Sequence, residues 1–290
     1  MAGIFKKLFN KPTNYVETEK QEQKPLNYVE KDNGSSVPKK TNSDKMKWSD
    51  LKPIEISKIK KIDFPEDSYY REDTPKNQVV LHFTVSGEGV KGDIDTWLSM
   101  KSRVATPLIV ERDGTPYQIF SSKYWAHHLG IKSTFLKEQG FKDSSKRNDL
   151  LNKGSIGIEI DNWGGLVLGD GTEKKFGNKL VKTIKGKFYA DYGNVVNVPV
   201  VEYPNGFRGY YYFEKFTDHQ IQTVGELLLF FNKRYDIPLD YNEDMWDISK
   251  DALSGKRGIY THVSYRTDKS DLHPQVEMIE MLKALKNIKI

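Results

Sequence analysis

Apolar residues recur along this chain with two different spacings, one typical of strands and the other of helices. Segments of the two kinds alternate, which predicts strands interleaved with helices. Short runs of apolar and β-branched residues bounded by turn residues are typical of buried strands. Such runs occur at residues 78–84, 107–111, 116–120, 155–160 and 258–261. Asp113-Gly114 lies between the second and third runs and is a strong hairpin signal. We therefore expect these segments to pair within one sheet.

Other segments have helical spacing. Ile94 to Leu98 is predicted to begin one helix, and residues 275–286 are predicted to form the last one. Thr217 and Gln220 make a capping box ahead of an apolar stripe that extends to about Tyr235. Strands and helices that alternate around one core indicate an α/β fold, with a central mixed β-sheet flanked by helices.

The two ends of the chain differ in character. Residues 1–50 are rich in Lys, Glu, Asn, Gln, Ser and Pro and lack sustained apolar patterning, which predicts a flexible, basic N-terminal tail. Residues 51–290 are expected to form the catalytic domain. A Gly- and Tyr-rich insertion is expected at about residues 161–215, with hairpin strands near 186–192, 195–201 and 210–213.

The tail contains a short repeat. The sequence Lys-Pro-x-Asn-Tyr-Val-Glu occurs at residues 11–17 and again at residues 24–30. A duplicated motif suggests docking to a partner, for example a virion protein, and the alternative is a solvated linker. Residues 4–9 place apolar side chains on one face of a short helix, which would also suit contact with a membrane surface.

Charge and composition narrow the function. Of the 45 basic and 40 acidic residues, 13 and 8 lie in residues 1–60, so the remaining 230 residues hold 32 of each. This neutral folded part argues against nucleic acid as a ligand. The chain has no cysteine, so disulfides and thiolate metal sites are excluded.

Targeting signals are also absent from the pattern. No apolar run approaches the roughly 18 residues of a membrane span. Lys6 and Lys7 interrupt the first apolar stretch, so no signal peptide is predicted. We expect the protein to be made in the cytoplasm and to act on the cell wall, or to be carried in a virion.

Three residues have the local context of zinc ligands. His82 ends an apolar run, His262 follows another, and Asp271 lies nine residues later in a polar loop. Two histidines and one carboxylate leave a fourth tetrahedral position for water, which is typical of a catalytic Zn²⁺ site. Such a site predicts hydrolysis. His273 remains a rival for the third position.

Six separated motifs carry a family resemblance. In chain order they read Val80-Leu81-His82-Phe83-Thr84, Asp113-Gly114-Thr115-Pro116-Tyr117-Gln118, Trp125-Ala126-His127-His128-Leu129-Gly130, Ser155-Ile156-Gly157-Ile158-Glu159, Thr261-His262 and Lys269-Ser270-Asp271-Leu272-His273-Pro274. Over about residues 76–290 the chain resembles zinc-dependent N-acetylmuramoyl-L-alanine amidases of the amidase-2 type. This superfamily includes peptidoglycan-recognition proteins and phage lysozyme-type amidases. The ending departs from the family pattern, because Leu272-His273-Pro274 replaces the usual Pro-Gly.

The resemblance implies roles for individual residues. It makes His82, His262 and Asp271 the zinc ligands and peptidoglycan the substrate. Glu159 would act as general base and Lys269 would stabilise the oxyanion. His128, Tyr117 and Trp125 would lie at the substrate groove, although core packing is an equal explanation for the two aromatic residues.

Other functions remain open at this point. The implied reaction is hydrolysis of the amide between N-acetylmuramic acid and L-alanine, in cell-wall lysis or remodelling, with a phage endolysin or virion-associated lysin as the setting. The alternatives are a non-catalytic peptidoglycan-binding protein or a structural virion protein on the same fold. A zinc peptidase of the His-Glu-x-x-His type is disfavoured, because that motif is absent.

Overall fold

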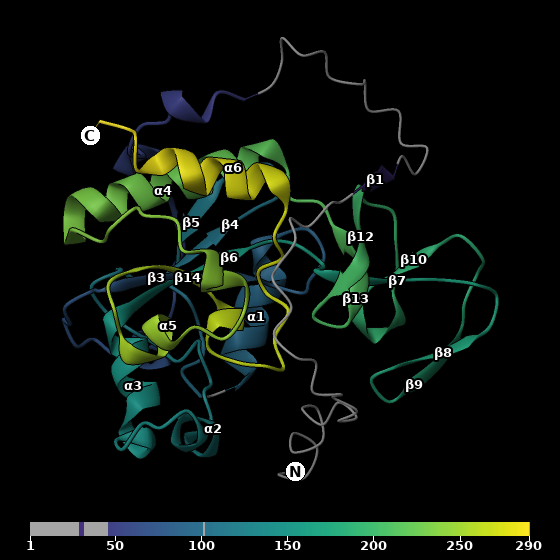
Figure 1. Ribbon diagram of the computed structural model, residues 1–290, viewed down its shortest axis with the longest axis horizontal. Coiled ribbons are helices and arrows are strands. Elements are labelled where there is room, and N and C mark those ends of the chain that lie inside the picture. Colours follow the sequence, from purple (N-terminus) through teal and green to yellow (C-terminus); the bar gives the residue numbers. More distant parts are fainter. Residues whose placement is uncertain (1–28, 32–45, 101, 290) are drawn as a thin grey trace.

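Two six-stranded sheets and one separate hairpin organise the chain (Figure 1). They are seen in a computed structural model that describes residues 29–31, 46–100 and 102–289. The first sheet is the core of the predicted α/β fold, and the second is built largely from the insertion. The repeat copy at residues 11–17 and the amphipathic segment at residues 4–9 lie outside the described residues.

The first sheet is mixed, as predicted, and its strand order is β14-β3-β6-β4-β5-β2. Strands β14, β3, β6 and β4 are parallel, while β5 pairs with β4 in the antiparallel hairpin expected at Asp113-Gly114. Parallel neighbours bring their carboxyl ends to one edge, which is where ligands bind in open α/β sheets. The strands are β2 (Lys60–Lys61), β3 (Gln78–Phe83), β4 (Leu108–Val110), β5 (Pro116–Gln118), β6 (Ser155–Ile160) and β14 (Gly258–Thr261).

One face of this sheet is covered by α4 (Asp218–Tyr235) and α6 (Val276–Leu285). The predicted capping box of α4 is present, since Thr217 and Gln220 bond reciprocally. The apolar stripe of α4 packs against alternate residues of β3 and β6, namely Val79, Leu81, Phe83, Ile156, Ile158 and Ile160. The remaining strand residues, among them Val80, His82 and Glu159, therefore face the other side.

That other face is packed by shorter elements: α1 (Val90–Met100), α2 (Ser133–Glu138), α3 (Ser144–Gly154) and α5 (Lys250–Ser254). The described residues also form short 3₁₀ helices: η3 (Trp48–Asp50), η4 (Ile56–Lys58), η5 (Glu66–Ser68), η6 (Asp191–Gly193), η7 (Glu243–Trp246) and η8 (His262–Ser264). Within the described residues, none of the helices has the length and apolar character needed to span a bilayer.

The second sheet has the order β1-β12-β13-β7-β10-β11. Its outer strand β1 comes from the segment expected to be a flexible tail and ends the second repeat copy. One face of the sheet joins the main core through Val201, Tyr203 and Phe213. The strands are β1 (Val29–Lys31), β7 (Gly165–Leu168), β10 (Phe188–Tyr189), β11 (Val195–Val196), β12 (Val200–Phe207) and β13 (Tyr210–Glu214), and the separate hairpin is β8 (Glu173–Phe176) with β9 (Lys179–Lys182).

A buried lysine joins three segments below the start of β3. The Lys76 ammonium donates to Thr74 Oγ1 at 2.9 Å, to the Tyr124 carbonyl at 2.9 Å and to the Lys153 carbonyl at 2.7 Å. Burial lowers the pKa of Lys76 to about 7 from its usual 10.5. Between these two values the unfolded chain binds a proton that the folded chain does not. Stability gained from this group therefore rises with pH and is lost as pH falls towards 7.

We expect Lys76→Met to remove this pH dependence. The free energy of unfolding of the unaltered protein should climb between about pH 7 and pH 10 by up to about 1.4 kcal/mol per pH unit from Lys76 alone. The variant should lack that increment, whatever its absolute stability. Urea unfolding across this range measures both slopes, with exposed Lys137→Met as the control. Equal slopes in the variant and the unaltered protein would contradict the assignment.

Candidate metal centre and catalytic site

The carboxyl ends of three parallel strands bring the predicted site residues together. His82 lies near the end of β3 and is paired in register with Glu159 of β6. Thr261 of β14 pairs with Leu81, so His262 follows directly beside His82 on the other side. The side chains of His82, Glu159 and His262 thus meet at one edge of the sheet because of strand order and register.

Asp271 completes a compact three-residue group. The loop that carries it is tied back to η8, since the Val263 amide donates to the Asp271 carbonyl at 3.0 Å. Asp271 Oδ2 lies 2.8 Å from His262 Nδ1 and 3.2 Å from His82 Nδ1, and the two Nδ1 atoms are 3.0 Å apart. Within the described part of the chain, this is the one group of His, Asp and Glu ligand atoms close enough to hold a metal ion.

The outer nitrogen of each histidine has its own partner. His262 Nε2 lies 2.9 Å from the Leu129 carbonyl. A carbonyl only accepts, so Nε2 carries the proton and the lone pair of Nδ1 points into the group. Histidine ligands are commonly fixed in this way by a bond from the far ring nitrogen.

A chain of hydrogen bonds fixes His82 in the same tautomer. Ser155 Oγ donates to the Leu151 carbonyl at 2.6 Å, so it accepts a bond from His128 Nε2 at 2.9 Å. His128 Nδ1 is then free to accept from His82 Nε2 at 3.0 Å. This leaves His82 Nδ1 unprotonated and directed at Asp271 and His262. His128, expected at the substrate groove, is thus bonded to the back of a candidate ligand.

Gly157 makes room for this chain. An ideal Cβ at Gly157 would lie 2.5 Å from Thr106 Cγ2 and 3.2 Å from His128 Nδ1. The first distance is far inside van der Waals contact. A glycine at this position of β6 therefore lets the His128 ring lie against the sheet below His82.

Electrostatics keep the group in the state that binds a cation. Burial lowers the pKa of His82 and lowers that of His262 to about 4, so both rings are neutral at pH 7. Burial alone would raise the pKa of Asp271, but its interactions with His262 and with the Lys269 cation outweigh that effect and hold the pKa below its usual range. Two neutral imidazoles and one carboxylate match the donor set that Zn²⁺ takes in catalytic sites.

Glu159 is the carboxyl group beside the three candidate ligands. Burial raises its pKa well above the usual value, with further contributions from the charges of Asp271 and Asp93, while Lys269 opposes the rise. Its Oε2 atom is buried and has no hydrogen-bond partner among the described residues. A cation held by the three ligands would lower this pKa again, because an opposite charge favours the carboxylate. Glu159 is therefore a buried and unpartnered carboxyl group on the strand next to His82.

His273 does not join the group. Its ring is buried against the second sheet, where it stacks on Phe216 with the ring centroids 4.5 Å apart. The Tyr203 hydroxyl bonds to His273 Nδ1 at 2.8 Å, and His273 Nε2 donates to the Glu214 carbonyl at 3.1 Å. Both ring nitrogens are thus occupied elsewhere, and the geometry favours Asp271 as the third ligand.

The two aromatic residues expected at the groove are engaged in packing. Trp125 is 5% exposed, stacks on Tyr70 with centroids 3.9 Å apart and donates from its indole to Glu72. Tyr117 of β5 packs against the apolar cluster that contains Phe64 and Ile109, and it lies under the Lys60 ammonium. Neither ring contacts the three candidate ligands, and little of the Trp125 ring remains for a sugar.

An ion network near the site was not anticipated from the sequence. Arg112 Nη1 lies 2.6 Å from Asp161 Oδ1. Arg112 Nε donates to Glu214 Oε1 at 2.8 Å. Its Nη2 donates to the Ser86 carbonyl at 3.0 Å. Arg112 therefore ties the loop after β3 and the end of β6 to the second sheet. The sequence carries only a weak signal for this network: Asp161 lies two positions after Glu159.

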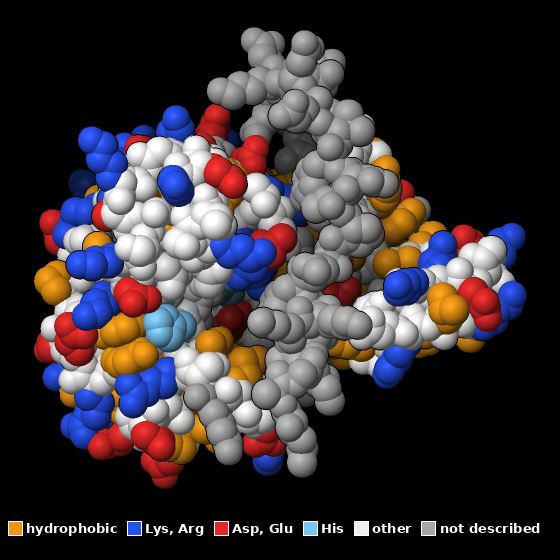
Figure 2. Space-filling model, turned by 90° about the horizontal axis from the view of Figure 1, so that it is seen from below, with side chains coloured by type: hydrophobic (Ala, Val, Ile, Leu, Met, Phe, Trp, Pro, Cys, Tyr) orange, Lys and Arg blue, Asp and Glu red, His pale blue; other side chains and the backbone are white. Residues whose placement is uncertain are grey.

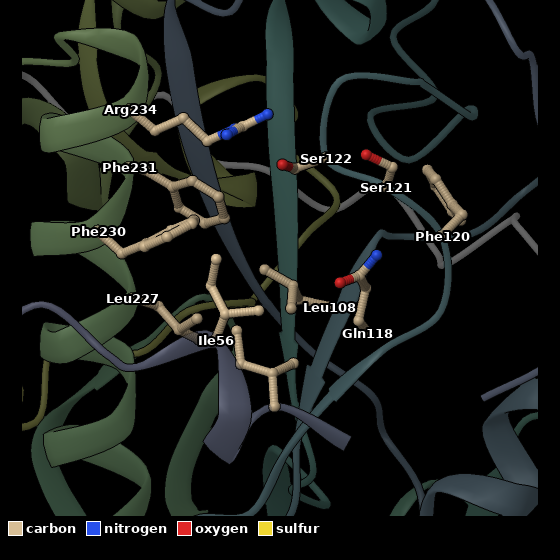
Figure 3. A pocket seen from close by; sticks show the side chains of 11 residues that line it. Ile56, Leu108, Gln118, Phe120, Ser121, Ser122, Leu227, Phe230, Phe231 and Arg234 are labelled. Carbon is tan, nitrogen blue, oxygen red and sulfur yellow. The ribbon is translucent and has the colours of Figure 1, made fainter. Parts of the chain in front are cut away.

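An apolar cavity lies on the opposite face of the main sheet (Figure 3). Leu227, Phe230 and Phe231 of α4 face Leu108 of β4 across it, and Arg234 lies at its edge. Leu108 belongs to the core under α4, whereas Ile109 shares the face of Glu159. This cavity is therefore separated from the candidate site by the sheet and contributes nothing to it.

Comparisons with known proteins identify a family for this chain. A family model described as Amidase_2, N-acetylmuramoyl-L-alanine amidase, matches residues 72–274. No curated protein matches the chain. Among solved structures, PlyL is 11% identical, with 80% of this chain and 99% of PlyL covered and a TM-score of 0.42. The endolysin amidase LysCS from Clostridium intestinale URNW is 14% identical, with 80% and 97% covered and a TM-score of 0.41.

A selenomethionine derivative of AmpD is likewise 14% identical, with 82% of this chain and 99% of AmpD covered and a TM-score of 0.42. The identification rests on the family model, which spans most of the chain and includes His82, Glu159, His262 and Asp271. The chain belongs to the Amidase_2 family of N-acetylmuramoyl-L-alanine amidases.

Proposed function

We propose that this protein is a zinc-dependent amidase that cleaves the bond between N-acetylmuramic acid and L-alanine in peptidoglycan. One observation carries the proposal: His82 Nδ1, His262 Nδ1 and Asp271 Oδ2 converge within 4.8 Å, beside Glu159, in a chain of the Amidase_2 family. We propose the cell wall as the place of action, in lysis or remodelling, with a phage endolysin or virion-associated lysin as the setting.

The three converging residues would hold the ion. Zinc held there would supply a Lewis acid for polarising the amide carbonyl and activating water. His82 and His262 present unprotonated Nδ1 atoms because their Nε2 atoms are bonded outward, to His128 and to the Leu129 carbonyl. The His128–Ser155 pair holds the His82 ring in orientation, which is the role that outer partners play in metal sites.

Glu159 and Lys269 would carry the chemistry of the chain itself. Glu159 would take a proton from the attacking water and deliver it to the nitrogen of the departing L-alanine. Its unpartnered Oε2 leaves an acceptor open for that water. Lys269 is close enough for its charge to influence His82, His262, Glu159 and Asp271. Its cation would stabilise negative charge that develops on the carbonyl oxygen.

Digestion of purified peptidoglycan tests the proposal. We expect stem peptides with a free L-alanine amino terminus among the products, identified by mass spectrometry, and we expect none after zinc is removed with a chelator. Addition of zinc should restore cleavage. Intact wall that nevertheless retains the protein would contradict hydrolysis and indicate a peptidoglycan-binding protein. Products cut at another bond would contradict the proposed specificity.

A further inference from the structure

The β8–β9 hairpin presents an exposed face that the hydrolysis of peptidoglycan does not explain. The hairpin projects from the second sheet, away from the main sheet (Figure 1). Register pairs Lys175 with Leu180 and Glu173 with Lys182, so these four side chains point to the same side. Pairing continues past β9, since the Thr183 amide donates to the Thr172 carbonyl. By alternation, Ile184 therefore joins them. We call Glu173, Lys175, Leu180, Lys182 and Ile184 the hairpin face.

The aliphatic residues of the hairpin face are unusually exposed. Leu180 is 70% exposed and Ile184 is 58% exposed. Five of the nine strongly exposed large apolar side chains within the described residues lie between residues 180 and 211, in the insertion. Single exposed apolar residues are ordinary, but a group of them marks a contact surface.

The segment that carries the hairpin face is basic, although Glu173 shares the face with Lys175 and Lys182. Residues 173–187 contain six lysines and one acidic residue, Glu173, although the part of the chain after residue 60 is neutral as a whole. One of these lysines, Lys174, pairs with Asp170 at 2.8 Å. Lys175 and Lys182, on the hairpin face, have no ion-pair partner among the described residues. In Figure 2, blue and orange side chains lie together on the projection to the right, which carries this hairpin, with a few red side chains among them.

The rear of the hairpin is anchored, so the face is held outward. Phe176 packs on Tyr189 with ring centroids 5.6 Å apart. Val181 lies so close to Gly193 that a Cβ there would be 2.7 Å from Val181 Cγ2. The exposed aliphatic side chains therefore cannot turn inward without breaking these contacts. If the exposed residues were only lysines, protection of the strand edges against aggregation would explain them. Leu180 and Ile184 do not fit this explanation, because exposed aliphatic side chains favour association.

We propose that the hairpin face docks on an anionic lipid membrane. Exposed aliphatic side chains enter the boundary between headgroups and acyl chains, and lysines around them are attracted to anionic headgroups. An anionic wall polymer fits less well. Leu180 and Ile184 offer neither hydrogen bonds nor the flat aromatic surface that sugars stack on, and the one ring of the hairpin, Phe176, is buried. The inference is independent of the proposed amidase activity.

Vesicle binding by the full chain tests this inference. Flotation would compare phosphatidylcholine vesicles with vesicles that also contain phosphatidylglycerol. We expect binding to the anionic vesicles, weakened by added salt. Leu180→Ser with Ile184→Ser should weaken it by about tenfold or more, since two aliphatic side chains lose their apolar contact. Lys175→Glu with Lys182→Glu should weaken it similarly.

Matched controls separate the hairpin face from general effects. Leu150→Ser on α3 removes an aliphatic side chain that is 56% exposed elsewhere, and Lys137→Glu reverses an exposed charge on α2. Both should bind like the unaltered protein, and all variants should digest purified peptidoglycan at the same rate. Unchanged vesicle binding by both hairpin variants would overturn the proposal. So would co-sedimentation with lipid-free wall polymer that depends on these residues, in the absence of vesicle binding.

Discussion

Replacing Asp271 with alanine is expected to remove bound zinc and to abolish most peptidoglycan hydrolysis. Asp271 supplies the only negative charge among the three converging ligand atoms, at 2.8 Å from His262 Nδ1 and 3.2 Å from His82 Nδ1. Lewis-acid stabilisation by a metal is worth several kcal/mol, so cleavage should fall by about 10³-fold or more. Zinc content after dialysis, measured by elemental mass spectrometry, and the release of soluble stem peptides give the two readouts.

His273→Gln is the matched comparison for Asp271→Ala. Glutamine retains a donor and an acceptor for the Tyr203 hydroxyl and the Glu214 carbonyl. We expect this variant to keep its zinc and most of its activity, although its unfolding temperature should fall because Phe216 loses a stacked ring. Full zinc occupancy in Asp271→Ala, or loss of zinc from a folded His273→Gln, would overturn the assignment of the third ligand.

Strongly patterned elements were predictable from the sequence. Strand β3 contains an apolar run and β6 alternates isoleucine with other residues, and both are buried because parallel strands are covered on both faces. Helix α4 has a capping box and an apolar stripe, and both are formed as predicted. The mixed sheet follows from these elements and from the Asp113-Gly114 hairpin.

Elements without such patterns were not predicted. Helix α3 is mostly polar and buries only Leu151 and Asn152. Its position is set by tertiary bonds, in which the Asn152 side chain accepts from the amides of His128 and Leu129. The β8–β9 hairpin is rich in lysine and exposed on one face, so it has no apolar run to reveal it. Local sequence cannot show contacts between segments that lie far apart.

Residue identity was easier to predict at the site than residue position. The sequence suggested His82, His262 and Asp271, and the structure brings their ligand atoms together. It could not show that His128 bonds to His82, because that contact depends on the close approach allowed by Gly157. Nor could it decide between Asp271 and His273. The two are separated by one residue in the chain, yet His273 is turned away into the core between Tyr203 and Phe216.

Replacing Glu159 with glutamine is expected to lower kcat by about 10²- to 10⁴-fold while zinc stays bound. General acid–base catalysis contributes a factor of this size, and an amide cannot accept and return the proton. Glutamine keeps the volume of the side chain, and Glu159 is not among the three converging ligands. Exposed Glu138→Gln on α2 is the control, and it should leave kcat and zinc content unaltered.

Two measurements together distinguish a proton-transfer role for Glu159 from a role in metal binding. If zinc content and KM are retained while kcat falls, the carboxylate acts on the reacting atoms. If zinc is lost together with activity, Glu159 instead supports the metal through its own negative charge. Cleavage within a few-fold of the unaltered protein would remove Glu159 from the mechanism. The buried, unpartnered Oε2 beside the candidate metal centre would then need another explanation, since such an atom is costly to retain.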